Sequence, residues 1–378
     1  MTDYCFRVCD GSPKIVKSPV VSSVRSAASG RNSSKRSLVR GFATFAIGKF
    51  PAHFGLAKVL GPSYSLRCVV FHDISESESS FTKGMGVTIS PSNFESALRF
   101  IAAHYHPVSL GDVLDHRRLP ERPVLLTFDD GYASVLDRAV PVCKRLGIPA
   151  TLFLNSAFLD NKCLSPDNLV CYVANIRGMG TINNAARIVL GKDAPELRAM
   201  MDVFRRLFTT ISLTQRAEFL EALRHLAEVN DAQLAAAERL YLTSGQVRAL
   251  SHEGFEIGNH TTCHVHCRNL RSRDRHEQID RNKMDLEKLS GRAVRSFSVP
   301  YGSSIDLSNE LTTYLRSSGH QGVFLSEGVS NTLLSGVVLD RVGVRGSGDE
   351  TTFVDLEVLP RLRFIRNRLR RRKLRIKE

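Results

Sequence analysis

The chain of 378 residues has few cysteines and no long hydrophobic run. Its eight cysteines are too few for this length to form a disulfide framework, and Cys68 and Cys143 stand in apolar stretches typical of buried thiols. No segment reaches the roughly 18 uninterrupted apolar residues of a membrane span, and no compact apolar segment follows the N-terminal basic residues. We therefore expect a globular protein of a reducing compartment, the cytoplasm.

The body of the chain also lacks net charge, although the whole chain carries +14. Residues 1–40 contribute +6 and residues 361–378 contribute +9, which leaves −1 for residues 41–360. A body that binds nucleic acid would need a basic surface, so we expect no nucleic acid partner.

The basic C-terminal tail has apolar residues at or near helical spacing, namely Leu362, Ile365, Leu369 and Ile376. This composition favours a helix that lies on an anionic membrane surface, which would place the protein peripherally at the inner membrane face. A solvated basic end is the alternative.

Three regions follow from the composition. Residues 1–60 predict a flexible basic arm with a short helix, residues 61–360 a folded domain, and residues 361–378 the basic tail. Within the domain, the pattern from about 160 to 242 is helical and shows no obvious catalytic residues, so we interpret it as an insertion.

Outside that insertion, strand and helix signals alternate, which argues for a parallel sheet. The expected strands number about seven, at residues 66–71, 124–128, 150–154, 255–257, 294–299, 322–325 and 337–342. With helices between most of them, the sheet is expected to roll into a deformed (β/α) barrel, and an open doubly wound sheet is the alternative.

Two adjacent carboxylates, Asp129 and Asp130, follow an apolar run at 124–128 and stand directly before Gly131. Ligands of α/β folds gather at the carboxyl ends of buried strands. Neighbouring strand residues point to opposite sides, so one acid can hold a metal while the other acts as a base. An ordinary Asp-Gly turn is the alternative.

A cluster of histidines and cysteines follows the predicted strand 255–257. Its His260 and His264 are four residues apart, and would lie on one face if the segment turned helically. Two imidazoles and one carboxylate can hold a catalytic zinc and leave positions open for water and substrate. The alternatives are solvent-facing histidines or a structural zinc knuckle that uses Cys263, His266 and Cys267.

Together these segments resemble the polysaccharide deacetylases of carbohydrate esterase family 4, which include chitooligosaccharide deacetylases. Residues 127–131, Thr-Phe-Asp-Asp-Gly, match the first motif of that family, and residues 260–264, His-Thr-Thr-Cys-His, match its His-Ser/Thr-x-x-His motif. Residues 297–302 resemble the third motif. The resemblance covers about residues 66–159 and 242–345.

The resemblance implies Asp129 as general base, and a divalent metal, with Zn²⁺ expected, held by Asp130, His260 and His264. Such a metal lowers the pKa of its bound water towards neutrality, and the base then takes the proton. In the family, the metal and the backbone N–H of the tyrosine that matches Tyr301 stabilise the oxyanion. An ordinary Pro-Tyr-Gly turn is the alternative for this tyrosine.

Two parts of the family pattern differ in this chain. Ser298 stands where many members carry the arginine that orients the base, and no clear late Leu-x-His motif is found. The only histidine after Tyr301 is His320, which is typical of a residue at the start of a strand. Instead, the first strand ends at His72, as in the branch of the family whose first strand ends in Tyr-His. The resemblance implies His72 as general acid, and a strand-end histidine bonded to its neighbours is the alternative.

The chain is therefore expected to be a metal-dependent deacetylase that removes N-acetyl groups from an amino-sugar oligo- or polysaccharide, with an N-acetylated glycan as its partner. An O-acetyl esterase that acts on acetylated polysaccharide would use the same site. A catalytically weak glycan-binding protein of the same fold is the further alternative.

Overall fold

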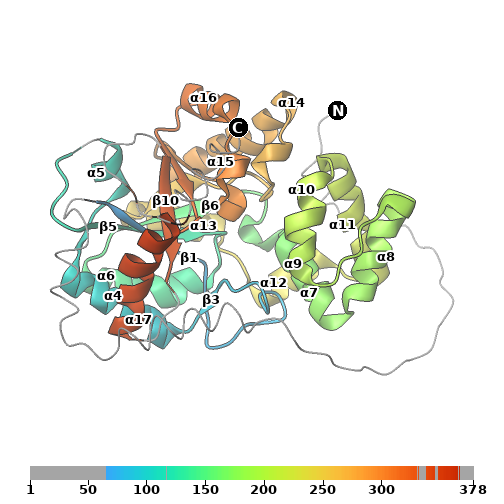
Figure 1. Cartoon of the computed structure of the whole chain (residues 1–378), viewed down its shortest axis with the longest axis horizontal. Helices are drawn as coiled ribbons and strands as arrows, with labels where there is room; N and C mark the ends of the chain where they lie inside the picture. The colour runs from blue at the N-terminus through green and yellow to red at the C-terminus, as the bar shows by residue number, and fades with distance from the viewer. Residues whose placement is uncertain are drawn as a thin grey trace. The chain divides into compact units, whose positions relative to one another are not determined.

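The computed structural model describes the following residues of the chain: 65–115, 117–329, 331, 338–344, 348–364 and 366. They form a barrel of parallel strands with helices around it and a group of inserted helices to one side (Figure 1). The expected N-terminal arm, its short helix and most of the basic tail lie outside the described residues.

Seven strands close the barrel because β1 pairs with both β5 and β10, and every pairing around the ring is parallel. These strands are β1 (Arg67–Phe71), β5 (Pro123–Asp129), β6 (Ala150–Leu154), β7 (Glu256–Asn259), β8 (Ser296–Ser298), β9 (Gly322–Leu325) and β10 (Val338–Gly343). The expected (β/α) barrel of about seven strands is confirmed, and the open sheet is not formed. The short β4 (His106–Pro107) extends the edge of β5, and β2 (Asp73–Ile74) pairs with β3 (Thr88–Ile89).

The inside of the barrel changes from apolar to polar along the strands. Leu125 of β5 lies opposite Cys68 of β1, and both belong to a buried apolar cluster that also holds Phe153 and Phe324. Because strand side chains alternate, the residues two and four positions after Leu125 also face inward, and the last of these is Asp129. The carboxylate of Asp129 therefore lies inside the barrel, at the carboxyl ends of the strands.

Helices pack outside the strands and follow their sequence signals. Ser90 caps the first long helix and accepts a hydrogen bond from the Asn93 N–H, with Pro91 at the first helical position. The helix over residues 135–146 ends at Gly147, whose φ of 65° is left-handed. The helices of the barrel are α4 (Pro91–His104), α5 (Leu110–Leu114), η1 (Val135–Ala139), α6 (Val140–Leu146), α13 (Ser244–His252), α14 (Ser272–Arg275), η6 (His276–Asp280), α15 (Arg281–Ser290), α16 (Asn309–Ser317), α17 (Asp349–Phe353) and η9 (Val354–Val358).

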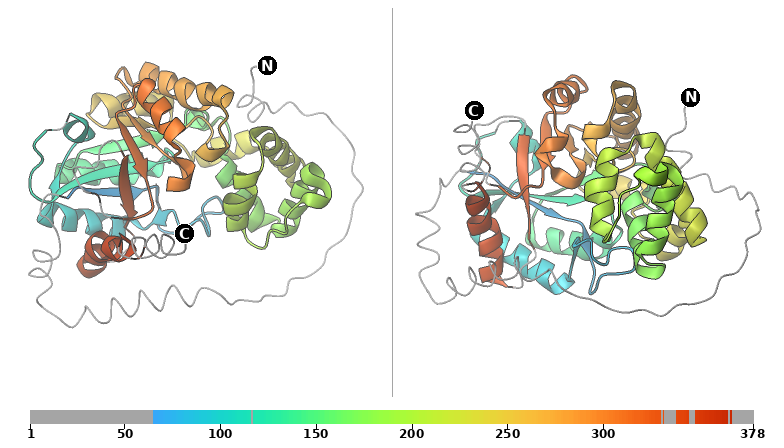
Figure 2. Two further views of the ribbon diagram at one scale, coloured as in Figure 1. Left: turned by 45° about the horizontal axis from the view of Figure 1, so that its top comes forward. Right: turned by 45° about the vertical axis from the view of Figure 1, so that its right-hand side comes forward.

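The insertion between β6 and β7 is helical, as its apolar spacing predicts, and its helices gather beside the barrel in both views of Figure 2. Its elements are α7 (Pro166–Ile176), α8 (Met179–Leu190), η3 (Gly191–Asp193), α9 (Met200–Asp202), η4 (Val203–Leu207), α10 (Phe208–Thr210), α11 (Leu213–Ala227) and α12 (Asp231–Glu238). A capping box of Ser212 and Gln215 begins α11. The insertion has its own apolar core, which continues into Phe297 and Val299 of the barrel. Because of this shared core, the insertion can hold side chains against the barrel mouth.

No helix among the described residues combines the length and the apolar character that a membrane crossing requires.

Candidate active site

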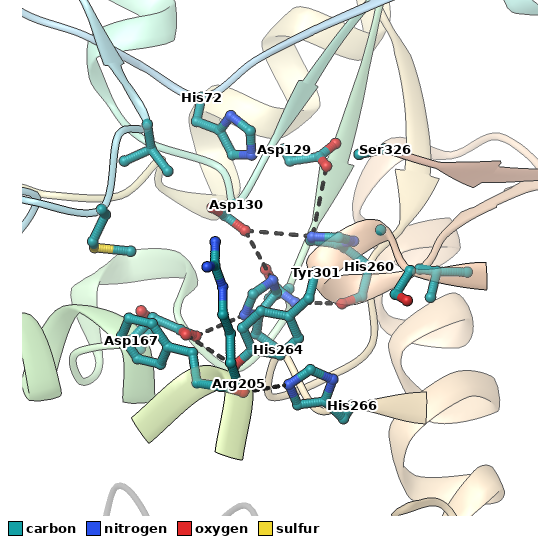
Figure 3. Close-up of a pocket in the computed structure, with 18 of the residues that line it drawn as sticks. His72, Asp129, Asp130, Asp167, Arg205, His260, His264, His266, Tyr301 and Ser326 are labelled. Atoms are coloured by element: carbon teal, nitrogen blue, oxygen red, sulfur yellow. Dashed lines mark hydrogen bonds and ion pairs between the residues drawn. The ribbon is translucent and has the colours of Figure 1, made fainter. Parts of the chain in front are cut away.

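A cavity of about 440 Å³ lies at the carboxyl ends of the barrel strands. The strand ends, the loops that follow them and the helical insertion all contribute to its lining (Figure 3). The structure brings together here every site residue expected from the sequence, namely His72, Asp129, Asp130, His260, His264 and Tyr301.

Asp129 ends β5, and only 3% of it is exposed. Its two carboxylate oxygens accept hydrogen bonds from Nη1 and Nη2 of Arg341, both at 2.7 Å, and Ser298 Oγ donates to Oδ2 at 3.3 Å. Burial by itself would raise the pKa of Asp129, but the guanidinium of Arg341 and the nearby His260 ring outweigh burial and lower that pKa below its ordinary value. The carboxylate is therefore held ionised, as a base must be.

Arg341 is a functional residue that the sequence reasoning missed. It comes from β10 and is 1% exposed, and its guanidinium lies over the rings of Phe153 and Phe324. Nη2 also donates to Ser298 Oγ at 2.7 Å, so the serine that stands at the position of the motif arginine contacts the guanidinium that lies beside Asp129. The available signal was an arginine inside the predicted strand 337–342, where a buried unpaired charge would be costly.

Asp130 does not continue the alternation of β5. Its φ of 68° and the φ of 70° at Gly131 turn the chain sharply, so its carboxylate faces the same cavity as Asp129. Oδ1 of Asp130 lies 3.4 Å from Nε2 of His260 and 3.6 Å from Nε2 of His264. Burial would raise the pKa of Asp130, but the two histidines lower it well below its ordinary value.

An irregular loop, and not the helical turn considered above, brings His260 and His264 together. His260 directly follows β7, and the segment to His264 is an irregular loop in which Thr261 and His264 have left-handed φ values of 63° and 48°. Nδ2 of Asn155 holds this loop by donating to the carbonyls of His260 and Thr261 at 2.6 and 2.8 Å. Buried hydrogen bonds, and not helical periodicity, therefore place both rings.

Each histidine has its Nδ1 engaged and its Nε2 directed at Asp130. His260 Nδ1 lies 2.8 Å from the Ser298 carbonyl, and His264 Nδ1 lies 2.7 Å from Asp167 Oδ2. These partners are acceptors, so each Nδ1–H donates to them, and Nε2 is the ring nitrogen that each histidine turns towards Asp130. One donor atom from each of Asp130, His260 and His264 lies within 4.8 Å of the others, and this is the single such group among the described residues. The residues thus fit one divalent metal.

Asp167 is a second residue that the sequence reasoning missed, because the insertion was expected to carry no catalytic residues. It stands in the first turn of α7, is 4% exposed, and accepts from both His264 Nδ1 and the Tyr301 hydroxyl, the latter at 2.9 Å. Burial lowers the pKa of His264, but the charges of Asp167 and Asp130 outweigh it and raise that pKa. Arg216 of α11 donates to the His264 carbonyl at 2.9 Å. The insertion therefore orients a metal-ligand candidate.

Tyr301 lies in a tight turn after β8. Its φ is 61°, its ring stacks on His266 with centroids 3.8 Å apart, and its hydroxyl is bound to Asp167. Gly302 has a φ of 65°, and a Cβ there would stand 2.4 Å from the Ser326 Cβ, so a larger residue would displace the turn. The Tyr301 ring is thus locked, which fixes the backbone that carries its N–H.

His72 follows β1 and lines the cavity next to Asp129 (Figure 3). Burial lowers the pKa of His72 by more than the nearby Asp130 and Asp129 raise it. His320, the other candidate, does not line this cavity and is 1% exposed, and Asn259 Nδ2 lies 3.1 Å from its Nε2. Burial lowers the pKa of His320 to about 4. Of the two histidines, only His72 lines the cavity, so the geometry favours His72 over His320 as the candidate general acid.

The structural-knuckle alternative has no support among the described residues. His266 Nδ1 lies 3.2 Å from Asp306 Oδ2, and its Nε2 lies 2.9 Å from the Phe204 carbonyl. Cys267 is buried, and burial raises its thiol pKa well above the ordinary value. Both residues thus serve the packing around Tyr301 and the insertion.

Comparisons with known proteins were made for sequence and for fold. A sequence model of the family described as polysaccharide deacetylase matches residues 116–323. No curated protein sequence matches the chain. Solved structures similar to it include the Streptococcus pyogenes deacetylase PplD in complex with acetate, with a TM-score of 0.51 and 12% identity over 78% of this chain and 100% of that one. Another is IcaB from Ammonifex degensii, with a TM-score of 0.48 and 17% identity over 77% of this chain and 95% of that one.

The likeness to PplD shows a shared fold, and the family model adds the sequence relationship. Because residues 116–323 span more than half of the chain, the match covers most of the barrel together with the insertion. The chain therefore belongs to the polysaccharide deacetylase family, a family of carbohydrate-deacetylating hydrolases.

Proposed function

We propose that this protein is a metal-dependent deacetylase that hydrolyses the N-acetyl groups of an amino-sugar oligo- or polysaccharide. The observation that carries the proposal is the pairing of Asp129, kept ionised by Arg341, with the Asp130, His260 and His264 donor set in one cavity. Two imidazoles and one carboxylate with open positions are typical of catalytic zinc, so Zn²⁺ is the proposed metal. When bound, it would polarise the acetyl carbonyl and acidify the attacking water.

The side chains then divide the proton transfers. Asp129 accepts a proton from the attacking water, because its carboxylate is ionised and both of its oxygens are fixed by Arg341. His72, directly after the neighbouring strand β1, donates a proton to the departing amine so that acetate and a free amino sugar result. The backbone N–H of Tyr301, held by its locked ring, would donate to the developing oxyanion.

The decisive measurement is acetate release from a panel of N-acetylated and O-acetylated glycans, before and after metal removal and after return of Zn²⁺. Release from N-acetylated substrates that disappears with the metal and returns with it would support the proposal. Preferential release from esters would favour the O-acetyl esterase. Binding without release would favour the glycan-binding alternative.

Asp129→Asn separates the base from the metal ligands. The variant should lose turnover on the order of 10²-fold or more, as expected for removal of a general base, while it keeps its metal content. His264→Ala should instead lose metal. Full turnover by Asp129→Asn would rule out the proposed base.

A further inference from the structure

One wall of the cavity is a single face of the inserted helices. The segments α9, η4 and α10 follow one another without a break from 200 to 210. Met201, Arg205 and Thr209 recur every fourth residue along it, and all three line the cavity. Residues four apart share a helix face, so this face is turned towards the strand ends that carry the carboxylates and histidines.

Arg205 differs from the other charged residues of the cavity in its partners. Asp129 is paired with Arg341, Asp167 with His264, and Arg268 with Asp306. The side chain of Arg205, in contrast, is exposed, points into the cavity, and forms no ion pair with any described residue (Figure 3). The cavity thus offers the guanidinium of Arg205, which has no anionic partner in the part of the chain that the structure describes.

The surroundings of this guanidinium suit a sugar. Met201 and Phe204 lie beside it on the same helical segment, and Met85 and Val87 also line the cavity. Apolar side chains of this kind can cover the faces of a sugar ring, while a planar guanidinium matches a carboxylate or a phosphate with two parallel hydrogen bonds.

We propose that Arg205 selects substrates in which the N-acetylated amino sugar carries an anionic group, a carboxylate or a phosphate, on itself or on the adjoining residue. The inference deepens the proposed deacetylase function and rests on it. When a neutral N-acetylated glycan binds, the guanidinium of Arg205 would stay hydrated and would add no affinity. An acidic one places its charge where the protein supplies the cation.

The test compares binding of matched oligosaccharides by calorimetry. The neutral probe is a tetramer of N-acetylglucosamine, the carboxylate probe a tetramer that alternates N-acetylglucosamine with glucuronate, and the phosphate probe N-acetylglucosamine 6-phosphate beside free N-acetylglucosamine. Wild-type protein should bind an acidic probe about tenfold to a hundredfold more tightly than its neutral counterpart, as expected for one charge-assisted contact. The acidic probe with the larger gain in affinity over its neutral counterpart identifies the preferred anion as a carboxylate or a phosphate.

Three variants isolate the contact. Arg205→Ala should remove the preference for the acidic probe and leave neutral binding unchanged, and Arg205→Lys should keep part of it. Arg206→Ala is the matched control, because Arg206 is adjacent and exposed but does not line the cavity, and its Nη1 donates to the Glu196 carbonyl instead. That control should bind like the wild type.

Acetate release from the same probes separates this inference from the proposed function. Charge-selective binding that depends on Arg205, without any acetate release, would overturn the deacetylase and leave the anion site standing. Acetate release with equal binding of neutral and acidic probes, or an Arg205→Ala variant that weakens both alike, would overturn the anion site and leave the deacetylase standing.

Discussion

Asp129 keeps its charge although almost none of its surface meets water. An isolated buried carboxylate costs several kcal/mol, and the bidentate contact with Arg341 offsets that cost. The pair is 1% and 4% exposed on its two side chains, so bulk water screens it little. Reactivity and stability are therefore linked at this single residue pair.

Arg341→Met should lower the free energy of unfolding at neutral pH by about 3–5 kcal/mol, because it leaves the Asp129 charge buried and unpaired. In the folded wild type the pKa of Asp129 is lowered, so its contribution is present above the unfolded pKa and is lost as the pH falls through the folded pKa. Urea unfolding at neutral and acidic pH should accordingly show a difference that shrinks in acid. Arg295→Met, at the partly exposed pair with Asp115, is the control and should change little.

The pH profile reports on Asp129 and His72 together. Asp129 must be ionised and His72 protonated for both to act, and the pKa of each is lowered. The acid limb of kcat/KM should therefore lie below the ordinary aspartate pKa of about 3.9, and the alkaline limb below the ordinary histidine pKa of about 6.5. His72→Ala should slow the reaction and remove the alkaline limb, while His320→Ala should do neither. An unchanged alkaline limb in His72→Ala would assign the general acid elsewhere.

At the scale of elements, helix α7 contacts the loop after β7 and holds one of its histidines in place. Asp167 at the start of α7 fixes the His264 ring and the Tyr301 hydroxyl, although these three residues lie on different segments. The helical insertion therefore completes a site whose other residues come from the barrel.

Asp167→Asn should weaken metal affinity by about 10- to 100-fold, as for other residues that orient a metal ligand, because an amide is a poorer partner for His264 Nδ1–H. Titration with Zn²⁺ against a competing chelator measures this directly, without reference to turnover. Asp193→Asn, at an exposed position of the same insertion, is the control. Equal zinc affinity for both variants would leave Asp167 with a packing role only.

At the scale of the whole molecule, the barrel gathers at one mouth residues that are up to 269 positions apart, from His72 to Arg341. Parallel strands all end at this mouth, so each can contribute one side chain to it. Beyond the barrel, helical structure continues to residue 364, with Arg361 paired to Glu357 and Arg363 donating to the Gly328 carbonyl.

The membrane contact of the tail and a cytoplasmic location stay predictions. A chain that ends at Phe364 would keep the Arg361 and Arg363 contacts and lose eight of the positive charges. Each charge near an anionic surface is worth about 1 kcal/mol, so the full chain should sediment with anionic vesicles and the shortened one should not. Salt should weaken that binding, and neutral vesicles serve as the control. Equal recovery of the full and the shortened chain with anionic vesicles would contradict the prediction.

The sequence by itself determined the elements and most of the site. Short apolar runs, the cap at Ser90 and the glycine at 147 are local signals, and the structure has strands, a helix start and a helix end there. The placement of Asp129 and Asp130 at a strand end is equally local, because it depends only on where the apolar run stops.

Only the tertiary structure decided which partners those residues have. Arg341 stands 212 residues from Asp129, and Asp167 stands 97 residues from His264, and no periodicity links either pair. The histidine loop does not turn helically, the condition under which spacing alone would align its two rings, and instead has left-handed residues and buried hydrogen bonds from Asn155. Local patterns report short-range backbone preferences, whereas burial of a charge is compensated by whichever opposite charge the closed barrel brings near it.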